Sequence, residues 1–595
     1  MDDHSKEDDI FMSSWNYHSS DEEMEPRERT RRDLERNNPC LADLVVGAQE
    51  AMLGGGDHYY PYDDDWWRDG RSIGQHEHLE ILRLMALTDS HHHHFFGGLI
   101  QNRSIRQLTL DNCDHEIITS LFPFFEENGN LRRLDILFDR VDQLREVIQN
   151  NNENVKARAI EYIGTALDKA RGTQIESLRL TGCGFDHLQF LWGGMPPLRS
   201  GPLERFFSSL AGLSTLKSLV LKQVCSTEPE GADLSEALAG YLRHANCALK
   251  HLDVSKNGFD DDSIVVLVDA LAEEGNTVEE LILAGCRSIK LRGWRAVVSL
   301  LRVPHSRIKT FACPRTDGIS YVANGIANCI ADNTTLVELD LSCLGTVGGP
   351  NLGPLSIINL ANSVIRNNTL KCLRLECTRF TDRGFEALIA WLSGPACALN
   401  SLSLYRSIIT DYYAELLAGA ITRNRSLTFL DLTTVDQHSE FDVSKWELFA
   451  KALCDPTSID STYRSNHTLE VMEDGVLWCG PRNEYYKYYD DVILSLEINR
   501  GSQSLSTAAR SKIIKHHFRE GNFTVEPFAD MDPGFVPHAL EWMGRHIQSH
   551  SSTRRWENDE ALSRLYKIVL NISNRVVGEE SRRKGQSSNK KPRLG

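Results

Sequence analysis

Hydrophobic and polar positions repeat in a fixed frame along most of the chain. Between Leu249 and Asn257, apolar side chains occupy positions 1, 4 and 6, and an asparagine occupies position 9. Side chains of a strand alternate between two faces, so Leu252 and Val254, at positions 4 and 6, are predicted to point into a core. Asn257 is expected to turn inward and to bond backbone groups that the bend leaves unpaired. Apolar residues at helical spacing follow and predict a helix that packs against the next unit.

The same frame begins at twelve places, and most of the spacings are 26 to 34 residues. The first residues of the frames are Leu79, Ile105, Leu131, Ile175, Leu216, Leu249, Val278, Ile308, Leu336, Leu370, Leu399 and Leu427, with a degenerate copy at Leu469. This is the pattern of leucine-rich repeats, in which each strand and helix bury their apolar faces against neighbouring units. The sequence therefore predicts the α/β fold of a leucine-rich-repeat solenoid (horseshoe). Twelve parallel strands are expected on the concave face, with helices on the convex face and a C-terminal helical cap.

Because each unit carries a full helix, the repeats over about residues 76–475 resemble the ribonuclease-inhibitor type of leucine-rich-repeat protein. The segment after them resembles the tail of a large uncharacterised family of leucine-rich-repeat proteins found mainly in diatoms. The matching residues are Lys512–Phe518, Gly521–Asn522, Phe528–Met531, Pro537–Ala539, Trp542–Arg545 and Leu562–Tyr566. Apolar spacing predicts helices over 508–520, 536–547 and 562–572. The resemblance implies a helical tail and contributes no established activity.

Composition divides the chain into four parts. They are an acidic, largely disordered N-terminal region at 1–75, a solenoid of about 12–13 repeats at 76–475, a helical cap at 476–575 and a basic, disordered tail at 576–595. The first part holds 19 Asp and Glu against 8 Lys and Arg, which favours disorder. Its aromatic segment Tyr59–Trp67 is interpreted either as a cap over the exposed end of the first repeat or as a docking motif, and the capping role is favoured.

Charge and composition exclude several classes of protein. The formal charge of −18 argues against a nucleic-acid or anionic-membrane binder. The chain has no run of 18 apolar residues that could cross a membrane, and its N-terminus lacks the layout of a signal peptide. A cytoplasmic protein is therefore predicted. The basic clusters Arg582–Lys584 and Lys590–Arg593 indicate either a nuclear import signal or a solvated tail.

Two polar residue types recur at fixed points of the frame. Cys113, Cys183 and Cys286 stand at position 9 and are predicted to be reduced, packed thiols. Asparagine stands three residues before several frames, where it is expected to end the preceding helix in a left-handed conformation. These asparagines are Asn102, Asn333, Asn367, Asn424 and Asn466. They also lie in N-x-S/T sequons, but without a signal peptide the capping role is favoured over glycosylation.

Insertions lengthen three units. Asn150–Asn154, Leu191–Pro202 and Asp455–Ser465 are rich in polar or helix-breaking residues and are predicted to be irregular loops. Insertions in a solenoid project from one rim, so these segments either touch partners or are tolerated variation.

Catalytic motifs are absent from the sequence. The chain lacks a Walker A loop, a dinucleotide-binding glycine fingerprint, a Gly-x-Ser-x-Gly elbow and a His-Glu-x-x-His pair. His91–His94 would hold a transition metal only adventitiously, because no second ligand set lies near it in the sequence. His538, Trp542 and Arg545 share one helical face and are interpreted as a seal on the last repeat. We therefore predict no enzyme activity, no cofactor and no metal.

Function is expected on the strand face, where positions 3 and 5 of each frame point away from the core. The predicted partner-binding residues are Asp253, Glu280, Glu338 and Asp340 in an acidic middle, and Arg374, Tyr405, Phe429 and Asp431 in the late repeats. The acidic residues would steer a basic segment of a partner. Arginine and aromatic residues are typical of binding hot spots.

The leading hypothesis is a non-enzymatic protein–protein interaction scaffold that binds a partner through the concave face. The alternative is a regulator of an enzyme, such as a small-GTPase activator or a nuclease inhibitor, for which Arg83, Arg133, Arg179 and Arg374 are eligible by position. A receptor-type immune sensor would need a nucleotide-binding domain, for which the acidic region is too short. The expected partner is an unidentified protein, with no specific nucleic acid and no membrane, and the sequence does not set the oligomeric state.

Overall fold

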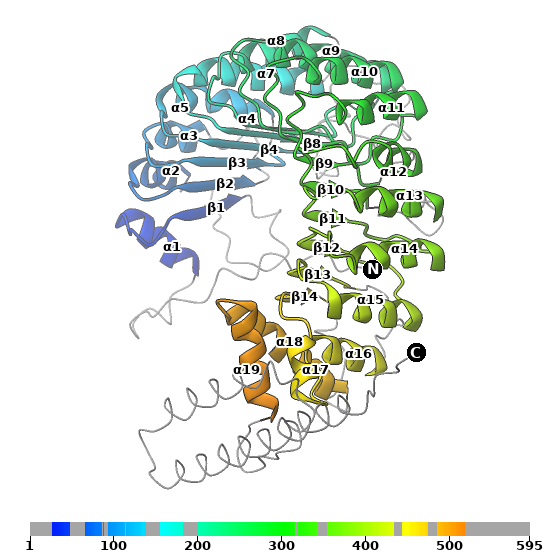
Figure 1. Ribbon diagram of the computed structural model, residues 1–595. Coiled ribbons are helices and arrows are strands. Elements are labelled where there is room, and N and C mark those ends of the chain that lie inside the picture. The colour runs from blue at the N-terminus through cyan, green and yellow to red at the C-terminus, as the bar shows by residue number, and fades with distance from the viewer. Residues whose placement is uncertain are drawn as a thin grey trace, which may run out of the picture. The chain divides into compact units, whose positions relative to one another are not determined.

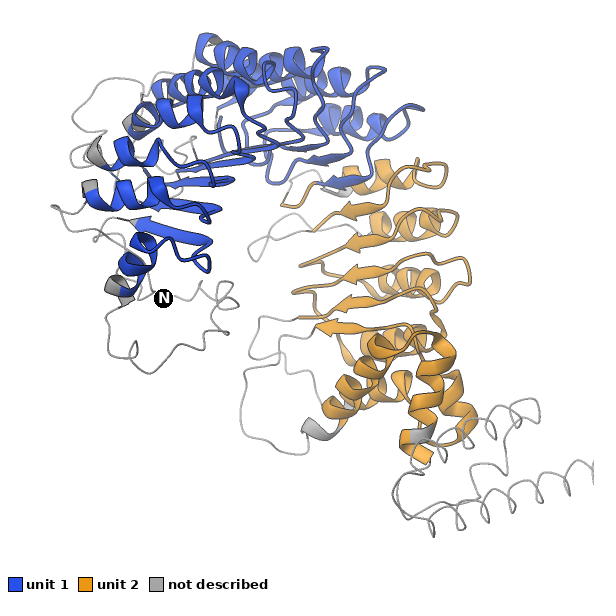
Figure 2. Ribbon diagram, turned by 90° about the vertical axis from the view of Figure 1, so that its left-hand side faces the viewer, with its two compact units in different colours: residues 1–312, 316–318 blue, residues 313–315, 319–595 orange. Residues whose placement is uncertain are grey.

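The computed structural model consists of two compact units. It describes residues 26–47, 66–85, 87, 93–113, 115–138, 155–182, 200–225, 227–315, 319–342, 354–433, 443–473 and 485–517. Unit 1 comprises residues 1–312 and 316–318, and unit 2 comprises residues 313–315 and 319–595 (Figure 2). Each unit is a stack of repeats, and a repeat contributes one strand and usually one helix (Figure 1).

Fourteen strands of the described residues run parallel in one sheet, in the order of the chain. Unit 1 holds β1 (Asp43–Gly47), β2 (Ile81–Met85), β3 (Gln107–Asp111), β4 (Arg133–Leu137), β5 (Ser177–Thr181), β6 (Ser218–Lys222), β7 (His251–Asp253), β8 (Glu280–Ile282) and β9 (Thr310–Ala312). Unit 2 holds β10 (Glu338–Asp340), β11 (Cys372–Arg374), β12 (Ser401–Ser403), β13 (Phe429–Asp431) and β14 (Val471–Glu473). Equivalent frame positions lie beside each other, as Leu252 lies beside Leu281. The predicted parallel solenoid is confirmed, with two strands more than the twelve expected.

Helices cover one face of the sheet in each unit and leave the other face to strand side chains. In unit 1 they are α1 (Pro26–Glu35), α2 (Trp66–Gln75), α3 (His93–Leu99), α4 (His115–Ser120), α5 (Phe122–Glu127), α7 (Val155–Lys169), α8 (Ser200–Leu210), α9 (Glu228–Leu242), α10 (Asp261–Leu271) and α11 (Leu291–Leu300). In unit 2 they are α12 (Ile319–Ala327), α13 (Pro354–Val364), α14 (Asp382–Leu392), α15 (Asp411–Arg423), α16 (Val443–Leu453), α17 (Ile459–Arg464), α18 (Tyr485–Gly501) and α19 (Leu505–His517). Polar N-caps begin several of them, such as Thr227 of α9 and Asp260 of α10.

Frame positions 1, 4 and 6 build the core. In all twelve predicted frames these three side chains are buried, and Leu252 is fully buried. A strand three residues long cannot be stable alone, so burial against the neighbouring repeats must supply the stability. The prediction of the buried positions is confirmed throughout the frames.

Position 9 turns inward, as predicted, and closes the bend after the strand. Nδ2 of Asn257 donates to the carbonyls of Leu221 and Val254 at 2.7 and 2.8 Å. Its Oδ1 accepts from the backbone N–H groups of Val224 and Cys225, at 2.9 Å each. One buried amide therefore satisfies four backbone groups in two adjacent repeats.

Cysteine replaces this asparagine in two described repeats. Sγ of Cys113 donates to the carbonyl of Leu84 at 3.2 Å, and Sγ of Cys286 donates to the carbonyl of Val254 at 3.6 Å. Both thiols are buried, and burial raises the pKa of Cys286 to about 12. The prediction of packed thiols is confirmed for these two, and Cys183 lies outside the described residues.

Position 8 carries the left-handed backbone conformation. The residues with positive φ at this position are Asn112, Gly182, Gln223, Lys256, Gly285, Arg315, Cys377 and Arg406. The N–H of position 8 donates to the carbonyl of position 7 in the next repeat, as Lys256 does to Ala284 at 2.7 Å. The hydrogen-bond ladder thus continues past the strands, which places position 7 on the strand face as well.

The asparagines before the frames do not take the left-handed conformation, so that prediction is wrong. Asn424 ends α15 with φ −68° and ψ 139°, which is extended backbone. Its Nδ2 donates to the carbonyl of Leu392 at 2.7 Å, and its Oδ1 accepts from the N–H of Leu427 at 2.7 Å. Similar bridges to the preceding repeat are made by Asn102, Asn367 and Asn466. Because these amides are buried between repeats, they act as links in the core and leave no room for a glycan.

Ordered repeats begin before residue 76, within the segment expected to be largely disordered. That segment contains α1, β1 and α2, and β1 pairs with β2 along its whole length. Leu41, Leu44 and Val46 occupy positions 1, 4 and 6 of the same frame, and Leu44 and Val46 are buried. The aromatic segment ends in α2, but the side chains of Trp66 and Trp67 lie outside the described residues, so their capping role stays a prediction.

Glycines bring the backbones of α2 and α3 into direct contact. A Cβ on Gly74 would lie 2.0 Å from the carbonyl oxygen of Gly98, and a Cβ on Gly98 would lie 2.3 Å from the carbonyl carbon of Gly70. Both neighbours are backbone atoms, which cannot move aside as a flexible side chain can. The adjacent Gly97 has nothing within 4 Å of its Cβ position.

Gly98→Ala should destabilise the first repeats by about 1–3 kcal/mol, because the two helices must separate to admit the methyl group. Gly97→Ala should be neutral or stabilise by up to about 1 kcal/mol, because alanine favours a helix over glycine. Urea denaturation followed by circular dichroism compares the two variants. Equal unfolding midpoints would contradict the close approach of α2 and α3.

The end of unit 2 is helical, as expected for a cap. α19 coincides with the helix predicted over 508–520, whereas α18 was not predicted. The insertion Asp455–Ser465 is not irregular: it contains α17, where Oγ of Ser458 accepts from the N–H of Ser461 at 3.0 Å. The prediction of an irregular insertion over 191–202 is wrong at its end, because residues 200–202 begin α8, and residues 191–199 lie outside the described residues. Also outside them lie the insertion at 150–154, the basic tail, and the helices predicted over 536–547 and 562–572, with His538, Trp542 and Arg545.

Candidate functional site on the strand face

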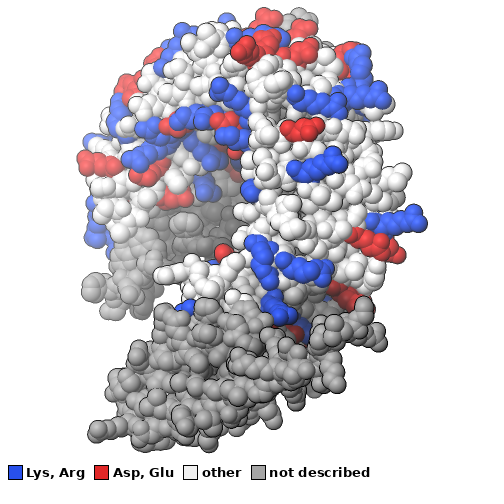
Figure 3. All heavy atoms as spheres, viewed as in Figure 1, with Lys and Arg blue, Asp and Glu red and all other residues white. Residues whose placement is uncertain are grey.

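The strand face consists of the side chains at frame positions 3, 5 and 7. These side chains alternate with the buried positions 4 and 6, as the burial of β2 and β5 illustrates. Acidic and basic side chains are interspersed over the visible part of unit 1 (Figure 3). Asp253 and Glu280 belong to unit 1, and the other six predicted site residues belong to unit 2, so the predicted acidic middle is divided between the units.

The first strands of unit 1 carry the arginines predicted for the early repeats. The guanidinium of Arg83 lies 3.8 Å from the carboxylate of Asp43, and that of Arg133 lies 2.8 Å from the carboxylate of Asp135. Arg179 is exposed, and it makes no hydrogen bond or ion pair with the part of the chain that the structure describes. Arg179 is therefore the early arginine that is most available to a partner.

Later strands of unit 1 hold the first two predicted acidic residues, and both are engaged. Oε2 of Glu280 lies 2.6 Å from Nδ1 of His251 on the adjacent strand β7. Oδ1 of Asp253 accepts from the backbone N–H of Ser255 at 2.9 Å and also from its hydroxyl. Both carboxylates are half-buried, which limits the surface that they offer to a partner.

Aspartate at position 5 has a structural role that the sequence pattern did not reveal. Asp253 bonds the N–H group two residues further on, which is the geometry of an Asx-turn. The same bond is made by Asp340 to Ser342 and by Asp431 to Thr433, each at 2.9 Å. These aspartates hold the bend that follows the strand, so turn formation accounts for part of the acidity of the strand face.

Arg374 of β11 forms an ion pair on the strand face of unit 2. Its Nη1 is 2.5 Å from Oε1 of Glu338 on the neighbouring strand β10, and both side chains are partly exposed. Burial raises the pKa of Asp340, and the negative charge of Glu338 raises it further, against the hydrogen bonds of Ser342 and the charge of Arg374. The ion pair thus lies beside a carboxyl group that is less readily ionised than usual.

A hydroxyl group joins two carboxylates next to this ion pair. Oγ of Ser403 lies 3.0 Å from Oδ2 of Asp431 and 3.2 Å from Oε1 of Glu376. A serine hydroxyl has one proton, so it can donate to only one of these carboxylates at a time. Burial raises the pKa of Glu376, and the charge of Asp340 raises it further. Burial and then the charge of Asp431 also raise the pKa of Glu473 on β14.

Glu376 and Glu473 extend the site beyond the predicted residues. Glu376 stands at position 7 of its frame, as Tyr405 does, and it was missed because only positions 3 and 5 were assigned to the strand face in every frame. The left-handed residue at position 8 keeps position 7 in the ladder. Glu473 stands at position 5 of the degenerate frame at Leu469, where it could have been found by counting that frame as a strand.

Tyr405, at position 7 of the β12 frame, and Phe429, at position 3 in β13, are both half-buried. The guanidinium carbon of Arg406 lies 5.2 Å from the centre of the Tyr405 ring, within reach of a cation–π contact. Phe429 lies beside Ser401 in the sheet. Unit 2 therefore brings together Glu338, Asp340, Arg374, Tyr405, Phe429 and Asp431 on one strand face, as predicted from their frame positions.

Potential metal-binding side chains do not cluster in the described residues. No group of three or more His, Cys, Asp and Glu side chains among them is arranged to hold a metal ion. The cysteines of this part of the chain are thiols. A search of the same residues finds no helix that is both long enough and apolar enough to cross a membrane.

Comparisons with known proteins agree with the repeat architecture. The family model described as Leucine Rich repeat matches residues 245–268 and 366–388, which contain β7 and β11 with part of the helix that follows each. Two solved structures show a partial similarity to this chain. A chain of the yeast Rad7 and Elc1 complex has a TM-score of 0.34 at 17% identity, over 69% of this chain and 90% of that chain. A chain of the TLR13–ssRNA13 complex has a TM-score of 0.29 at 13% identity, over 62% of this chain and 45% of that chain.

Curated relatives share sequence with the repeats at low identity. NACHT, LRR and PYD domains-containing protein 14 of Mus musculus is 24% identical over 64% of this chain and 36% of its own length. NACHT, LRR and PYD domains-containing protein 5 of Mus musculus is 25% identical over 42% of this chain and 21% of its own length. Protein 14 of Homo sapiens is 26% identical over 40% of this chain and 20% of its own. The chain thus spans about a third or less of the length of these relatives.

Proposed function

We propose that this leucine-rich-repeat protein is a non-enzymatic scaffold that binds a protein partner through the strand face, and that unit 2 provides the docking patch. The docking patch consists of Glu338, Asp340, Arg374, Glu376, Asp431 and Glu473. The observation that supports the proposal most directly is the gathering of these carboxyl groups on consecutive strands around Ser403 and Arg374. A basic segment of a partner has the complementary charge.

The charge arrangement costs folding free energy, which favours a functional role. Neighbouring strands lie about 4.8 Å apart, so acidic side chains on adjacent strands fall within a Debye length of about 8–10 Å. Asp340 and Asp431 offset part of this cost by closing turns. Glu376 and Glu473 close no described turn, and their raised pKa values reflect burial and neighbouring charge. The proposal therefore depends mainly on these two glutamates and on Glu338.

Glu376→Lys combined with Glu473→Lys should reduce capture of the partner at least tenfold at low salt, because the reversed charges repel a basic segment. The measurement is affinity capture from cell extract at about 50 mM salt, quantified for each captured protein. The matched control is Glu415→Lys with Glu447→Lys, which makes the same charge change on exposed positions of α15 and α16. The control should capture as well as the wild type.

Unchanged capture by the first variant would refute the docking patch. Loss of capture by both variants would show that net charge alone controls binding, which also contradicts a local patch. The melting temperature of each variant is measured first, so that a loss of capture is not assigned to unfolding.

A regulator of an enzyme is the second candidate function, and the exposure of Arg179 favours it. An activator of a small GTPase must present an arginine, or another residue that completes the site of its partner. Arg374 is held by Glu338 and would have to leave that ion pair, whereas Arg179 makes no such bond in the described residues. Arg179→Ala would then remove stimulation of the partner enzyme while leaving capture intact.

The type of repeat, the family of the tail and the cellular location are part of the same proposal. A helix in nearly every repeat supports the ribonuclease-inhibitor type. α19, which contains part of the matching segment, supports the diatom family with its helical tail. The proposed location is the cytoplasm, with nuclear import through the basic tail as the alternative, and deletion of residues 581–595 from a tagged protein separates the two.

A further inference from the structure

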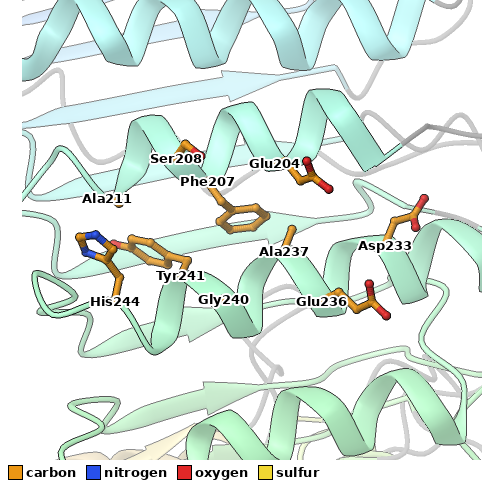
Figure 4. A pocket seen from close by; sticks show the side chains of 10 residues that line it. All are labelled: Glu204, Phe207, Ser208, Ala211, Asp233, Glu236, Ala237, Gly240, Tyr241 and His244. Atoms are coloured by element: carbon orange, nitrogen blue, oxygen red, sulfur yellow. The ribbon is translucent and has the colours of Figure 1, made fainter.

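We infer that the groove between α8 and α9 of unit 1 binds a lysine side chain of a partner polypeptide. The groove is a cavity of about 480 Å³ on the helical side of the sheet, within the size range of ligand sites. Figure 4 shows its lining, with three carboxylates at one end, the ring of Phe207 in the middle and Tyr241 with His244 at the other end. None of these residues belongs to the docking patch.

The middle of the groove suits an aliphatic chain. The rings of Phe207 and Tyr241 lie with their centres 6.0 Å apart, and each residue is only 4% exposed, so the floor is apolar and firmly packed. Small residues of α9, Ala237 and Gly240, leave the space above the floor open. A Cβ on Gly240 would meet nothing within 4 Å. The methylene groups of a lysine can lie along such a surface while the charged end extends beyond it.

Glu204, Asp233 and Glu236 form the acidic end of the groove. Asp233 and Glu236 are three residues apart on α9 and so share one face, which Glu204 of α8 faces across the groove. Among the residues that the structure describes, none of the three carboxylates has an ion-pair or hydrogen-bond partner. Burial raises the pKa of Asp233, and the charges of Glu236 and Glu204 raise it further, as expected for like charges that lie close together.

Lysine fits this end better than arginine does. An ammonium group is a compact charge with three donors, which suits three carboxylates that two helices place at the same end of the groove. A guanidinium group is planar and suits one or two carboxylates in a fork. From Asp233 to Tyr241, both on α9, the helix rises by about 12 Å, at 1.5 Å per residue. The groove is therefore long enough for the stem of a lysine and the peptide group that carries it.

A peptide titration tests the proposal. The probe is a fluorescein-labelled peptide, Gly-Gly-Lys-Gly-Gly with an amidated C-terminus, and its binding to the full chain is followed by anisotropy. It should bind at least tenfold more tightly than the same peptide with N-acetyl-lysine. Glu236→Gln should weaken binding at least fivefold, whereas Glu274→Gln, an exposed position outside the groove, should leave it unchanged. Equal binding of the acetylated peptide would overturn the proposal, and equal binding of an arginine peptide would overturn the choice of lysine.

Filling the groove supplies a steric test that does not depend on charge. Gly240→Leu should abolish binding without lowering the melting temperature, because its new side chain enters open space. Gly419→Leu is the matched control, since this glycine of α15 also has nothing within 4 Å of its Cβ position. Unchanged binding by Gly240→Leu would overturn the proposal. Competition by free cadaverine at the concentration of the peptide would overturn the choice of a polypeptide, because it would identify a site for free amines.

The groove and the docking patch can be tested independently. The variant with Glu376→Lys and Glu473→Lys should bind the lysine peptide as the wild type does, because its changes lie in unit 2. Loss of peptide binding in that variant would assign the lysine to the docking patch and would overturn the groove. Failure of the groove would in turn leave the partner capture by the docking patch unaffected.

Discussion

Asn257→Ala should lower the free energy of unfolding by about 3–4 kcal/mol. The substitution removes one side-chain amide and with it the bonds to four backbone groups, the carbonyls of Leu221 and Val254 and the N–H groups of Val224 and Cys225. Of these groups, the carbonyl of Val254 keeps the weak bond from Sγ of Cys286. Asn257 is 3% exposed, so water cannot readily replace the lost bonds. Urea denaturation measures the change, and hydrogen exchange should show the loss of protection in the repeats of β6 and β7.

Asn257→Cys should cost clearly less than Asn257→Ala. Cys113 and Cys286 occupy the same position in other repeats, and each donates to a carbonyl of the preceding repeat. A thiol restores one of the bonds and fills part of the volume. Asn246→Ala, at an exposed position of the same repeat, should be nearly neutral. Equal losses for the alanine and cysteine variants would show that the volume of the side chain, and not its hydrogen bonds, holds the bend.

Most of the fold could be predicted because every unit of a solenoid has the same local pattern of buried and exposed positions. Leu249, Leu252 and Val254 define the frame, and the buried positions of all twelve predicted frames follow the same rule. Each repeat contacts only its neighbours, so no long-range pairing had to be guessed. The inward turn of Asn257 also followed, because a bend leaves backbone groups that need partners.

The elements β1 and α18 were not predicted, because the surrounding composition or the weak apolar pattern made the repeat hard to recognise. Leu41, Leu44 and Val46 obey the rule of the frame, but acidic residues surround them and suggested disorder. α18 buries one face, but two of the four buried residues, Ser495 and Asn499, are polar, and only Val492 and Leu496 are apolar. Local periodicity alone cannot identify such a helix, because its packing against the repeats decides the structure.

The candidate site was predicted by position and only partly by role. The alternation of a strand places Glu338 and Arg374 on the open face, and the structure confirms that placement. The alternation of strand positions does not predict that Asp340 and Asp431 close turns. The same carboxylate can bind a partner or accept a hydrogen bond from its own backbone. The alternation also does not predict that Glu376 belongs to the site, because its placement depends on the left-handed residue at position 8.

Lys512 of α19 is a buried cation at the end of the last repeats. Its Nζ donates to the carbonyls of Leu453 and Asn466 at 2.7 and 2.8 Å, and the side chain is fully buried. Leu453 ends α16, where the last carbonyls of a helix lack intrahelical partners. Burial lowers the pKa of Lys512 to about 7. The two carbonyl bonds favour the ammonium form and oppose this effect in part.

The stability of unit 2 should therefore rise with pH above neutrality. An ordinary lysine has a pKa near 10.4, so between pH 7 and that value the unfolded chain binds more protons than the folded chain does. Raising the pH through this window relieves the cost of the buried charge, which is fully present below pH 7. The wild type should gain about 2–4 kcal/mol between pH 7 and 10 relative to Lys512→Met, which cannot titrate. Urea denaturation at several pH values measures both proteins, with Lys515→Met, a less buried position of α19, as the matched control. The control should keep the pH dependence of the wild type, and equal pH dependence of wild type and Lys512→Met would contradict a depressed pKa at this residue.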